Sequence, residues 1–184
     1  SHAKTLGYTP TSARASKAVV DVTLNTNSSS LTMPAGTVFN TAVDGVSYNF
    51  STITDVTKSN TGNSIPFTNI DIYEGTFITT RYSVDSSDVD QRFLLTDNRA
   101  DTTTLTVKVQ TSSSDSTTTT YTKATDITQL TASSNVYFLQ EVEAGVFEIY
   151  FGDGIIGSAL SDGNIIILTY VVSNKSLANG AALF

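Results

Sequence analysis

The sequence predicts a mainly β protein, either an antiparallel β-sandwich or two small linked β subdomains with one or two short helices. Three observations support this prediction. Apolar and polar residues alternate along many short segments, which is the period of a half-buried strand. These segments are rich in β-branched and aromatic residues and are separated by Gly, Asn, Asp and Ser. No segment keeps a helical period of apolar residues over several turns.

The clearest alternation lies in residues 104–110 (TLTVKVQ), where Leu105, Val107 and Val109 share one face. The last strand expected, residues 164–172 (NIIILTYVV), is apolar on both faces. Such a strand belongs in the centre of a sheet or at a protein–protein seam. The remaining expected strands are, in chain order, residues 18–24, 46–50, 75–84, 92–95, 136–142 and 146–151.

Two short helical turns and two connections complete the predicted organisation. The turns are expected at residues 10–18 and 126–132, the second with Asp126 as its N-cap. Residues 55–66 and 112–120 are dense in turn formers and read as exposed connections, although the Thr run of the latter is also compatible with the outer strand of a hairpin. These connections suggest an N-terminal β subdomain, 1–69, completed by 133–184, and an inserted β-rich subdomain, 70–132.

Composition excludes several functional classes. The 184-residue chain has a net charge of −7, which disfavours nucleic-acid binding, and no apolar run long enough to span a bilayer. It has no Cys, and its only histidine is His2. A zinc site and a Ser-His-Asp triad both need such residues. We therefore expect a protein that is not an enzyme and that binds neither nucleic acid nor membranes.

The segment GDGIIG carries Gly152, Gly154 and Gly157 in the spacing of a dinucleotide-binding loop. That site needs a helix N-terminus after the glycines and an acidic residue about 20 positions further on. Here another strand follows instead, and no acid stands near Leu177. The residues from Asp153 to Asp162 also lack the spacing of a calcium loop. We expect no cofactor, and we interpret the glycines as turn residues.

Two groups of carboxylates are further candidates. Asp85, Asp88 and Asp90 offer hard oxygen ligands to a cation, or they belong to a solvated turn. Glu141 and Glu143 lie two apart on one expected strand, whereas glycoside hydrolysis needs two carboxyls facing each other across a cleft. We assign no catalytic residues and no metal ligands.

Several stretches in a fixed order resemble the baseplate wedge proteins of contractile-tailed phages, the baseplate J-like family, and most closely its T-even-type myophage inner-ring form. They are LGYTPTSARASKAVVDVTL, LTMPAGTVF, DGVSYNFST, YEGTFITTRYSV, QRFLLTDNRADTTTLTVKVQ and VYFLQEVEAGVFEIYFGDGIIGSALSDGNIIILTYVVSN. The most specific block is FGDG followed by a loop, a second Gly turn and an apolar strand.

The resemblance implies a structural protein of the virion tail baseplate, assembled in the host cytoplasm, of which this chain is an internal fragment. It also implies wedge and hub proteins as partners and a homo-oligomer for the full-length protein. Such proteins form a ring around the hub and relay the signal for sheath contraction. The family supplies no catalytic residues.

The partner-binding surface is expected on the apolar strand and the chain's last residues, 178–184. The alternative function is a carbohydrate-binding or adhesin β-sandwich module, which would gather Tyr, Asn and Asp in one concave patch. The expected interaction residues are Ile165, Ile166, Ile167, Leu168, Tyr170 and Val172.

Overall fold

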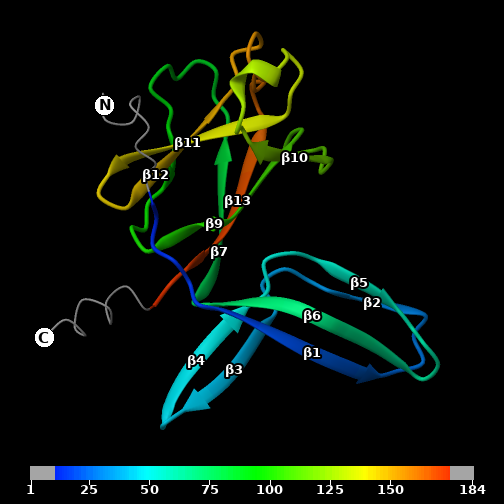
Figure 1. Ribbon diagram of the computed structural model, residues 1–184. Helices are drawn as coiled ribbons and strands as arrows, with labels where there is room; N and C mark the ends of the chain where they lie inside the picture. Colours follow the sequence, from blue (N-terminus) through cyan, green and yellow to red (C-terminus); the bar gives the residue numbers. More distant parts are fainter. Residues whose placement is uncertain (1–10, 175–184) are drawn as a thin grey trace, which may run out of the picture. The chain divides into compact units, whose positions relative to one another are not determined.

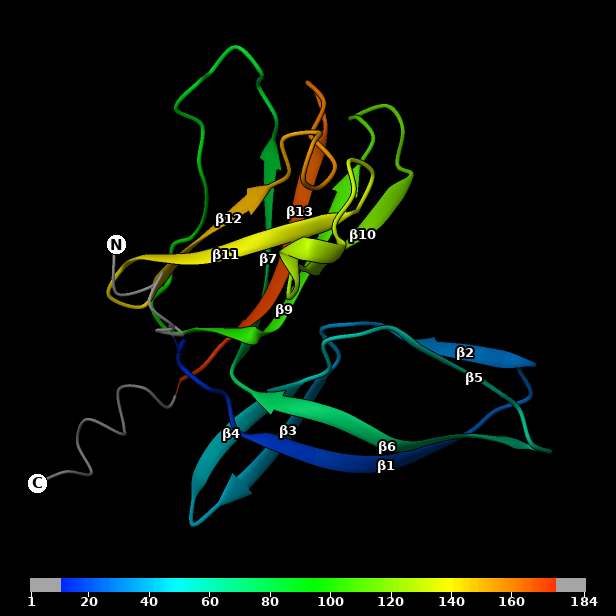
Figure 2. The same ribbon diagram turned by 45° about the horizontal axis from the view of Figure 1, so that its top comes forward.

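A computed structural model describes residues 11–174 and confirms the mainly β fold class. Figures 1 and 2 show strands joined by turns and loops. No helix in the described part of the chain is long and apolar enough to cross a membrane. The strands are β1 (Lys17–Asn25), β2 (Ser30–Met33), β3 (Val38–Val43), β4 (Val46–Ser51), β5 (Val56–Ser59), β6 (Ser64–Glu74), β7 (Thr76–Ser83), β8 (Phe93–Leu95), β9 (Ala100–Gln110), β10 (Thr118–Lys123), β11 (Val136–Glu143), β12 (Val146–Phe151) and β13 (Ile165–Val172).

Of the two expected helical turns, one is present. Residues Ile127–Gln129 form a single 3₁₀ turn, and the Asp126 carboxylate accepts a hydrogen bond from the Thr128 amide as the predicted N-cap. The turn expected at residues 10–18 is wrong, since residues 11–16 have no regular structure and β1 begins at Lys17. The β-branched run after Lys17 favours the strand and outweighs the preceding Ser and Ala residues.

The chain divides into two compact units, which we describe separately: a first unit, Arg14–Phe77 with residues 171–174, and a second unit, Ile78–Tyr170 with residues 11–13. The sequence-based boundaries differ, because they join residues 133–170 to the N-terminal strands. In the structure β11 instead pairs with β10, and β12 pairs with β8, so residues 133–151 complete the sheet of the second unit.

The first unit contains a four-stranded sheet in the order β1-β6-β4-β3 and a two-stranded ribbon of β2 and β5. The ribbon corrects the expectation that residues 55–66 are only a connection. Its strands are only four residues each, so the alternation of Leu31 and Met33 with polar residues is too short to predict a strand. A hydroxyl contact of 2.7 Å joins Thr32 to Thr57 across the ribbon. The core of this unit is formed by Met33, Ile65, Phe67, Ile70 and Ile72.

The pairing of β1 with β6 contains a bulge on β6, where Thr68 and Asn69 lie opposite the single residue Asp21. The register shifts between Val20 and Val22, and Asn69 opposite has a positive φ of 55°. The Asp21 carboxylate accepts a hydrogen bond of 2.8 Å from the Asn69 amide. Asn tolerates this left-handed conformation better than most residues, so a local side-chain contact stabilises the bulge.

The second unit contains a seven-stranded sheet in the order β7-β13-β9-β10-β11-β12-β8. The Tyr82 side chain on β7 bridges the two edge strands: its hydroxyl donates to the Leu94 carbonyl at 2.7 Å and accepts from the Leu94 amide at 3.3 Å. The side chain of Gln91 donates to the Ser83 carbonyl and accepts from the Asp85 amide, and so closes the loop between β7 and β8. Side-chain contacts therefore connect the two edges of this sheet.

Apolar and aromatic side chains fill the interior of the second unit. Tyr82, Phe93, Phe151 and Tyr121 form a chain of edge-to-face ring contacts with centroids 5.5 to 5.9 Å apart. Strand β13 lies between β7 and β9, which confirms the central position expected for this apolar strand. The largest fully buried side chains of the unit include Leu95, Val107, Phe147, Ile149, Ile166 and Leu168.

Candidate interaction surface

The glycine-rich loop between β12 and β13, residues 152–164, has a tightly fixed backbone. A Cβ atom on Gly152 would lie 2.2 Å from the carbonyl carbon of Gly157, so the two glycine backbones are in direct contact. Gly154 and Gly157 both have a φ of +84°, which glycine adopts without strain. The glycines therefore turn the chain, as predicted, and strand β13 follows them instead of a helix.

Asp153 holds the tip of this loop. One of its carboxylate oxygens accepts hydrogen bonds of 2.8 Å from the amides of both Ile155 and Ile156. These bonds, the one from Ile156 most strongly, lower the pKa of Asp153 below its usual range. The side chains of the two isoleucines are thereby presented on an ordered turn.

The glycine-rich loop is hydrogen-bonded to the segment 124–135. The Gly157 amide donates to the Thr131 carbonyl at 2.9 Å, and the Ser158 amide donates to the Ser134 carbonyl at 2.8 Å. Within that segment Asp126 caps the 3₁₀ turn, and the Thr128 hydroxyl lowers the pKa of its carboxyl. Both hydrogen bonds between the glycine-rich loop and segment 124–135 join backbone groups, so neither requires a particular side chain.

Two further connections join the same loop. The Ser86 amide donates to the Asp162 carboxylate at 2.8 Å, and the Gly163 amide donates to the Val84 carbonyl, which ties the loop to residues 84–91. The Asn164 side chain donates to the Thr111 carbonyl at 2.9 Å, which ties it to residues 111–117. We call the four connected segments, 84–91, 111–117, 124–135 and 152–164, the loop end of the second unit; Figure 2 shows them beyond the strand ends.

The loop end exposes large apolar side chains. The exposed fractions are 92% for Val89, 76% for Ile155, 61% for Ile127 and 43% for Ile156. Single exposed apolar residues are common on protein surfaces. Here four of them stand on connections that are joined to one another by hydrogen bonds.

The charged side chains of the loop end are all acidic. Its segments contain no Lys and no Arg, but they contain seven aspartates: Asp85, Asp88, Asp90, Asp115, Asp126, Asp153 and Asp162. Most of them accept hydrogen bonds from nearby amides, as Asp85 does from Ser87 and Asp115 from Thr117. The hydrogen bond from the Ser87 hydroxyl, and after it the bond from the Ser87 amide, lower the pKa of Asp85. The bond from the Thr117 amide lowers the pKa of Asp115. A partner with basic side chains would complement this surface.

A hollow of about 300 Å³ borders the glycine-rich loop. Its apolar lining includes Phe93, Phe151 and Leu160. At its wall Arg92 makes a bidentate ion pair with Glu148, with N–O distances of 3.0 and 2.9 Å. This pair, and a hydrogen bond from the Tyr150 hydroxyl, lower the pKa of Glu148. The charge of Glu148 is thus already paired with Arg92. The apolar side chains of the hollow are the part of it that could contact an apolar group of a partner.

The structure separates the predicted interaction strand into two sets. Ile166, Leu168, Tyr170 and Val172 are buried, whereas Ile165 and Ile167 are half-buried. An interaction through this strand stays a prediction, and the half-buried pair is the part of it that a partner can reach. The expected contact through residues 178–184 falls outside the described residues.

The carboxylate candidates do not converge. Within residues 11–174 no three His, Cys, Asp or Glu side chains lie close enough to hold a metal ion, and this includes Asp85, Asp88 and Asp90. Asp85 and Asp88 instead accept hydrogen bonds within their own turn, from Ser87 and the Asp90 amide. Glu141 accepts a bond of 3.1 Å from the Gly145 amide in the β11–β12 turn.

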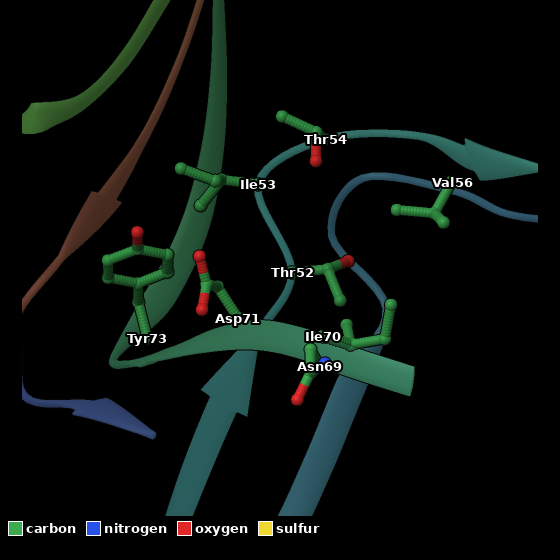
Figure 3. Close-up of a pocket in the computed structure, with 8 residues that line it drawn as sticks. All are labelled: Thr52, Ile53, Thr54, Val56, Asn69, Ile70, Asp71 and Tyr73. Atoms are coloured by element: carbon green, nitrogen blue, oxygen red, sulfur yellow. The ribbon is translucent and has the colours of Figure 1, made fainter. Parts of the chain in front are cut away.

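The first unit has a smaller hollow of about 200 Å³, shown in Figure 3. Asn69, Asp71 and Tyr73 line it, which are the residue types expected of a carbohydrate site. In Figure 3 Asp71 and Tyr73 point the same way, but Asn69 points the other way. Asp71 also makes an ion pair of 3.2 Å with Lys17, whose ammonium lies 6.0 Å from the centre of the Tyr73 ring.

Sequence reasoning did not single out the apolar residues of the loop end. The signal was present in GDGIIG, where two isoleucines stand between glycines, since a turn has no interior in which to bury them. Val89 is a comparable case, because it is surrounded by Asp and Ser residues in DSSDVDQ. Large apolar residues inside sequences that otherwise predict turns were therefore the overlooked evidence.

Comparison with known proteins assigns the second unit to a family. The model of the bacteriophage baseplate wedge protein gp6, third domain, matches residues 78–180, which is more than half of the chain. The match begins at residue 78, where the second unit begins. No curated protein matches the chain. The resemblance to baseplate wedge proteins is thus confirmed, and the chain belongs to the family of the third domain of the baseplate wedge protein gp6, with a structural role in the phage tail baseplate.

Proposed function

We propose that the chain assembles into the ring around the baseplate hub and that the loop end of the second unit is its contact with a neighbouring wedge or hub protein. The observation that carries this proposal is the pair Ile155 and Ile156, exposed on a turn that Asp153 and two glycine backbones hold in place. A contact surface that is already ordered loses little conformational entropy when it binds.

The proposed role in contraction follows from the same rigidity. Transmission of a receptor signal requires an element that moves as a body and does not deform. Hydrogen bonds from the glycine-rich loop to three other connections, and the Tyr82 bridge between the sheet edges, meet that requirement. The chain acts here as a structural link, without catalysis, and joins the baseplate during assembly in the host cytoplasm.

Co-expression with the other wedge and hub proteins of the same phage tests the contact. A double variant, Ile155→Asp with Ile156→Asp, removes the apolar contact and adds negative charge, so at least a tenfold weaker complex is expected. Val46→Asp is the matched control, because Val46 is 53% exposed in the first unit. Equal binding by the double variant and the wild type would contradict the proposal.

A second candidate function, carbohydrate binding, is favoured by one observation. Asp71 and Tyr73 face the same side of the hollow in the first unit, where a carboxylate and an aromatic ring can hold a sugar. A glycan array probed with the chain tests it. Specific binding with a dissociation constant in the micromolar range, lost in Tyr73→Ala, would establish this function.

A further inference from the structure

The same dipeptide, Asp–Gly, occurs three times in the part of the chain that the structure describes. The three pairs are Asp44–Gly45, Asp153–Gly154 and Asp162–Gly163. Asp–Gly is a reactive sequence, because glycine has no side chain to keep its backbone nitrogen away from the preceding carboxyl group. All three aspartates are exposed, so exposure alone does not distinguish them. Their hydrogen bonds do.

The Asp153–Gly154 pair is held at both groups that would react. The Gly154 amide donates to the Gly157 carbonyl at 3.0 Å. The Asp153 carboxylate accepts bonds of 2.8 Å from the amides of Ile156 and Ile155, which fix the carboxyl group and lower its pKa. An ionised carboxylate resists attack by a nitrogen. Reaction here requires these bonds to open first.

The Asp162–Gly163 pair is held in the same way by a different segment. The Gly163 amide donates to the Val84 carbonyl at 2.9 Å. The Asp162 carboxylate accepts a bond of 2.8 Å from the Ser86 amide. Both Asp–Gly pairs of the glycine-rich loop therefore have the backbone nitrogen and the carboxyl group engaged with other partners.

The Asp44–Gly45 pair forms the two-residue turn between β3 and β4, and we call these two strands with their turn the β3–β4 hairpin. In the described part of the chain no hydrogen bond involves the Asp44 carboxylate or the Gly45 amide. A Cβ on Gly45 would meet nothing within 4 Å. Figure 1 shows the two cyan strands running to a free tip. Both reacting groups are therefore unengaged and have space around them.

The turn also opens more readily than the glycine-rich loop. Asp44 has a φ of 51°, a left-handed conformation that is unfavourable for a residue with a side chain. Strand β4 pairs with β6 through Phe50 and Ser51, at the base of the hairpin. A two-stranded hairpin without further cover is only marginally stable in water. Opening of the tip, which lets the Gly45 nitrogen approach the Asp44 carboxyl carbon, is thus opposed by few contacts.

We propose that Asp44 is a site of isomerisation to isoaspartate. The Gly45 nitrogen attacks the side-chain carboxyl carbon of Asp44, and a new C–N bond forms. The proton of the nitrogen and the hydroxyl of the carboxylic acid leave together as water, and a five-membered succinimide ring remains. Water then adds to the main-chain carbonyl carbon of the ring, whose bond to the nitrogen breaks. The nitrogen regains a proton, a free α-carboxylate is left, and no oxidant or reductant is needed.

The product changes the length of the turn. The main chain then runs through the former side chain of Asp44, which adds one carbon between the two strands. The register of a hairpin is fixed by the type and length of its turn. Val43 and Val46, which are paired across the turn, would lose that pairing first. We expect isomerisation to loosen the β3–β4 hairpin.

Incubation of the chain at neutral pH, followed by peptide mapping with fragmentation that distinguishes the two linkages, tests the proposal. In the folded chain Asp44 is expected to isomerise at least about tenfold faster than Asp153 or Asp162, because several hydrogen bonds must open at those two sites. In concentrated urea the three pairs should react within about threefold of one another. Isomerisation leaves the mass unchanged, which separates it from deamidation at Asn179–Gly180, outside the described residues.

Ser86→Pro tests the protection directly, since it removes the amide that donates to Asp162. Ser86 follows Asp85 in a turn closed by a bond of 3.1 Å from the Asp88 amide to the Asp85 carbonyl, a position that accepts proline. The variant should isomerise about three- to tenfold faster at Asp162 and at an unchanged rate at Asp44.

Asp44→Glu is the negative control, because its longer side chain would have to close a six-membered ring. Circular dichroism verifies that both variants keep the β fold. Equal rates at the three pairs in the folded chain, or a slower rate at Asp44, would overturn the proposal. The same ratio of rates in urea as in the folded chain would also overturn it, since the neighbouring sequence and not the structure would then set the reactivity.

Discussion

The two units treat their sheet edges and loops in different ways. In the second unit Tyr82 bridges the edge strands, Gln91 closes the loop between them, and the glycine-rich loop is bonded to three other connections. In the first unit β3 stays open along its length, and the β3–β4 turn is exposed. The connections of the second unit are thus held by bonds to one another, whereas the β3–β4 hairpin of the first unit is held to its sheet only at its base.

The glycines do not follow this contrast. At Gly45 and Gly62 in the first unit an added Cβ would meet nothing within 4 Å. At Gly152 it would overlap the backbone of Gly157, and at Gly145 it would lie 2.8 Å from the Asn98 carbonyl oxygen. In the first unit, however, a Cβ on Gly75 would lie 2.3 Å from the Val172 carbonyl oxygen, and on Gly163 in the second unit it would meet nothing within 4 Å. Both units therefore contain glycines in open turns and glycines in close backbone contact.

The largest expected effects come from the two cores. Phe67→Ala in the first unit and Phe147→Ala in the second each remove a nearly fully buried ring, and each is expected to lower the free energy of unfolding by about 3–5 kcal/mol. Hydrogen exchange should show that Phe67→Ala weakens protection mainly in β1 and β6, while Phe147→Ala weakens it mainly in β11 and β12. Equal losses of protection in both units, from either variant, would mean that the two units unfold together.

The next largest effect is expected for Gly152→Ala. It should lower the free energy of unfolding by about 3 kcal/mol, because the methyl group would collide with the Gly157 backbone. Gly163→Ala in the same loop is its control. Gly163 has a φ of +79° but open space around it, so only the backbone strain of about 1–2 kcal/mol applies. Chemical denaturation measures both variants, and equal losses would show that the Gly152–Gly157 contact carries no special weight.

Tyr82→Phe tests the bridge between the sheet edges. The ring keeps its contact with Phe93, but both hydrogen bonds to Leu94 are lost, which should cost about 1–2 kcal/mol. Exchange of the Leu94 amide should accelerate. Tyr48→Phe in the first unit serves as the control, with an expected effect below about 0.5 kcal/mol. If Tyr82→Phe leaves the free energy of unfolding unchanged, the hydrogen bonds between Tyr82 and Leu94 do not stabilise the second unit.

The smallest expected effect is the response of the loop end to acid. The folded pKa of Asp153 lies below its value of about 3.9 in an unfolded chain. Its contribution is therefore fully present above about pH 4 and is lost as the pH falls through the lower, folded value. The amide resonances of Ile155 and Ile156 should stay constant from pH 7 to 5 and shift below pH 4. A titration between pH 5 and 6 would contradict this assignment.

Much of the fold could be predicted from the sequence, and the reasons differ between strands. Strand β9 alternates apolar and polar residues, and β13 is apolar on both faces, so period and composition indicate them directly. Strands β2 and β5 are four residues each, too short for their alternation to stand out from the neighbouring turn residues. They form because they pair with each other, a long-range contact that no local pattern records.

The candidate site was harder to predict. The glycines of GDGIIG were recognised as turn residues, but their positive φ angles and mutual contact arise only when the loop folds back on itself. The exposure of Ile155 and Ile156 depends on Asp153 holding their amides at the tip. The strand Ile165–Val172 was predicted as the interaction element because it is apolar, and most of those apolar side chains lie inside the unit.

Hydrogen exchange of the complex between the chain and its co-expressed wedge neighbours tests the loop-end contact most directly. Binding should protect the amides of residues 84–91, 124–135 and 152–164 and leave those of the β3–β4 hairpin unchanged by the partner. Protection confined to the hairpin or to strand β13, with the loop end as open to exchange as in the free chain, would contradict it.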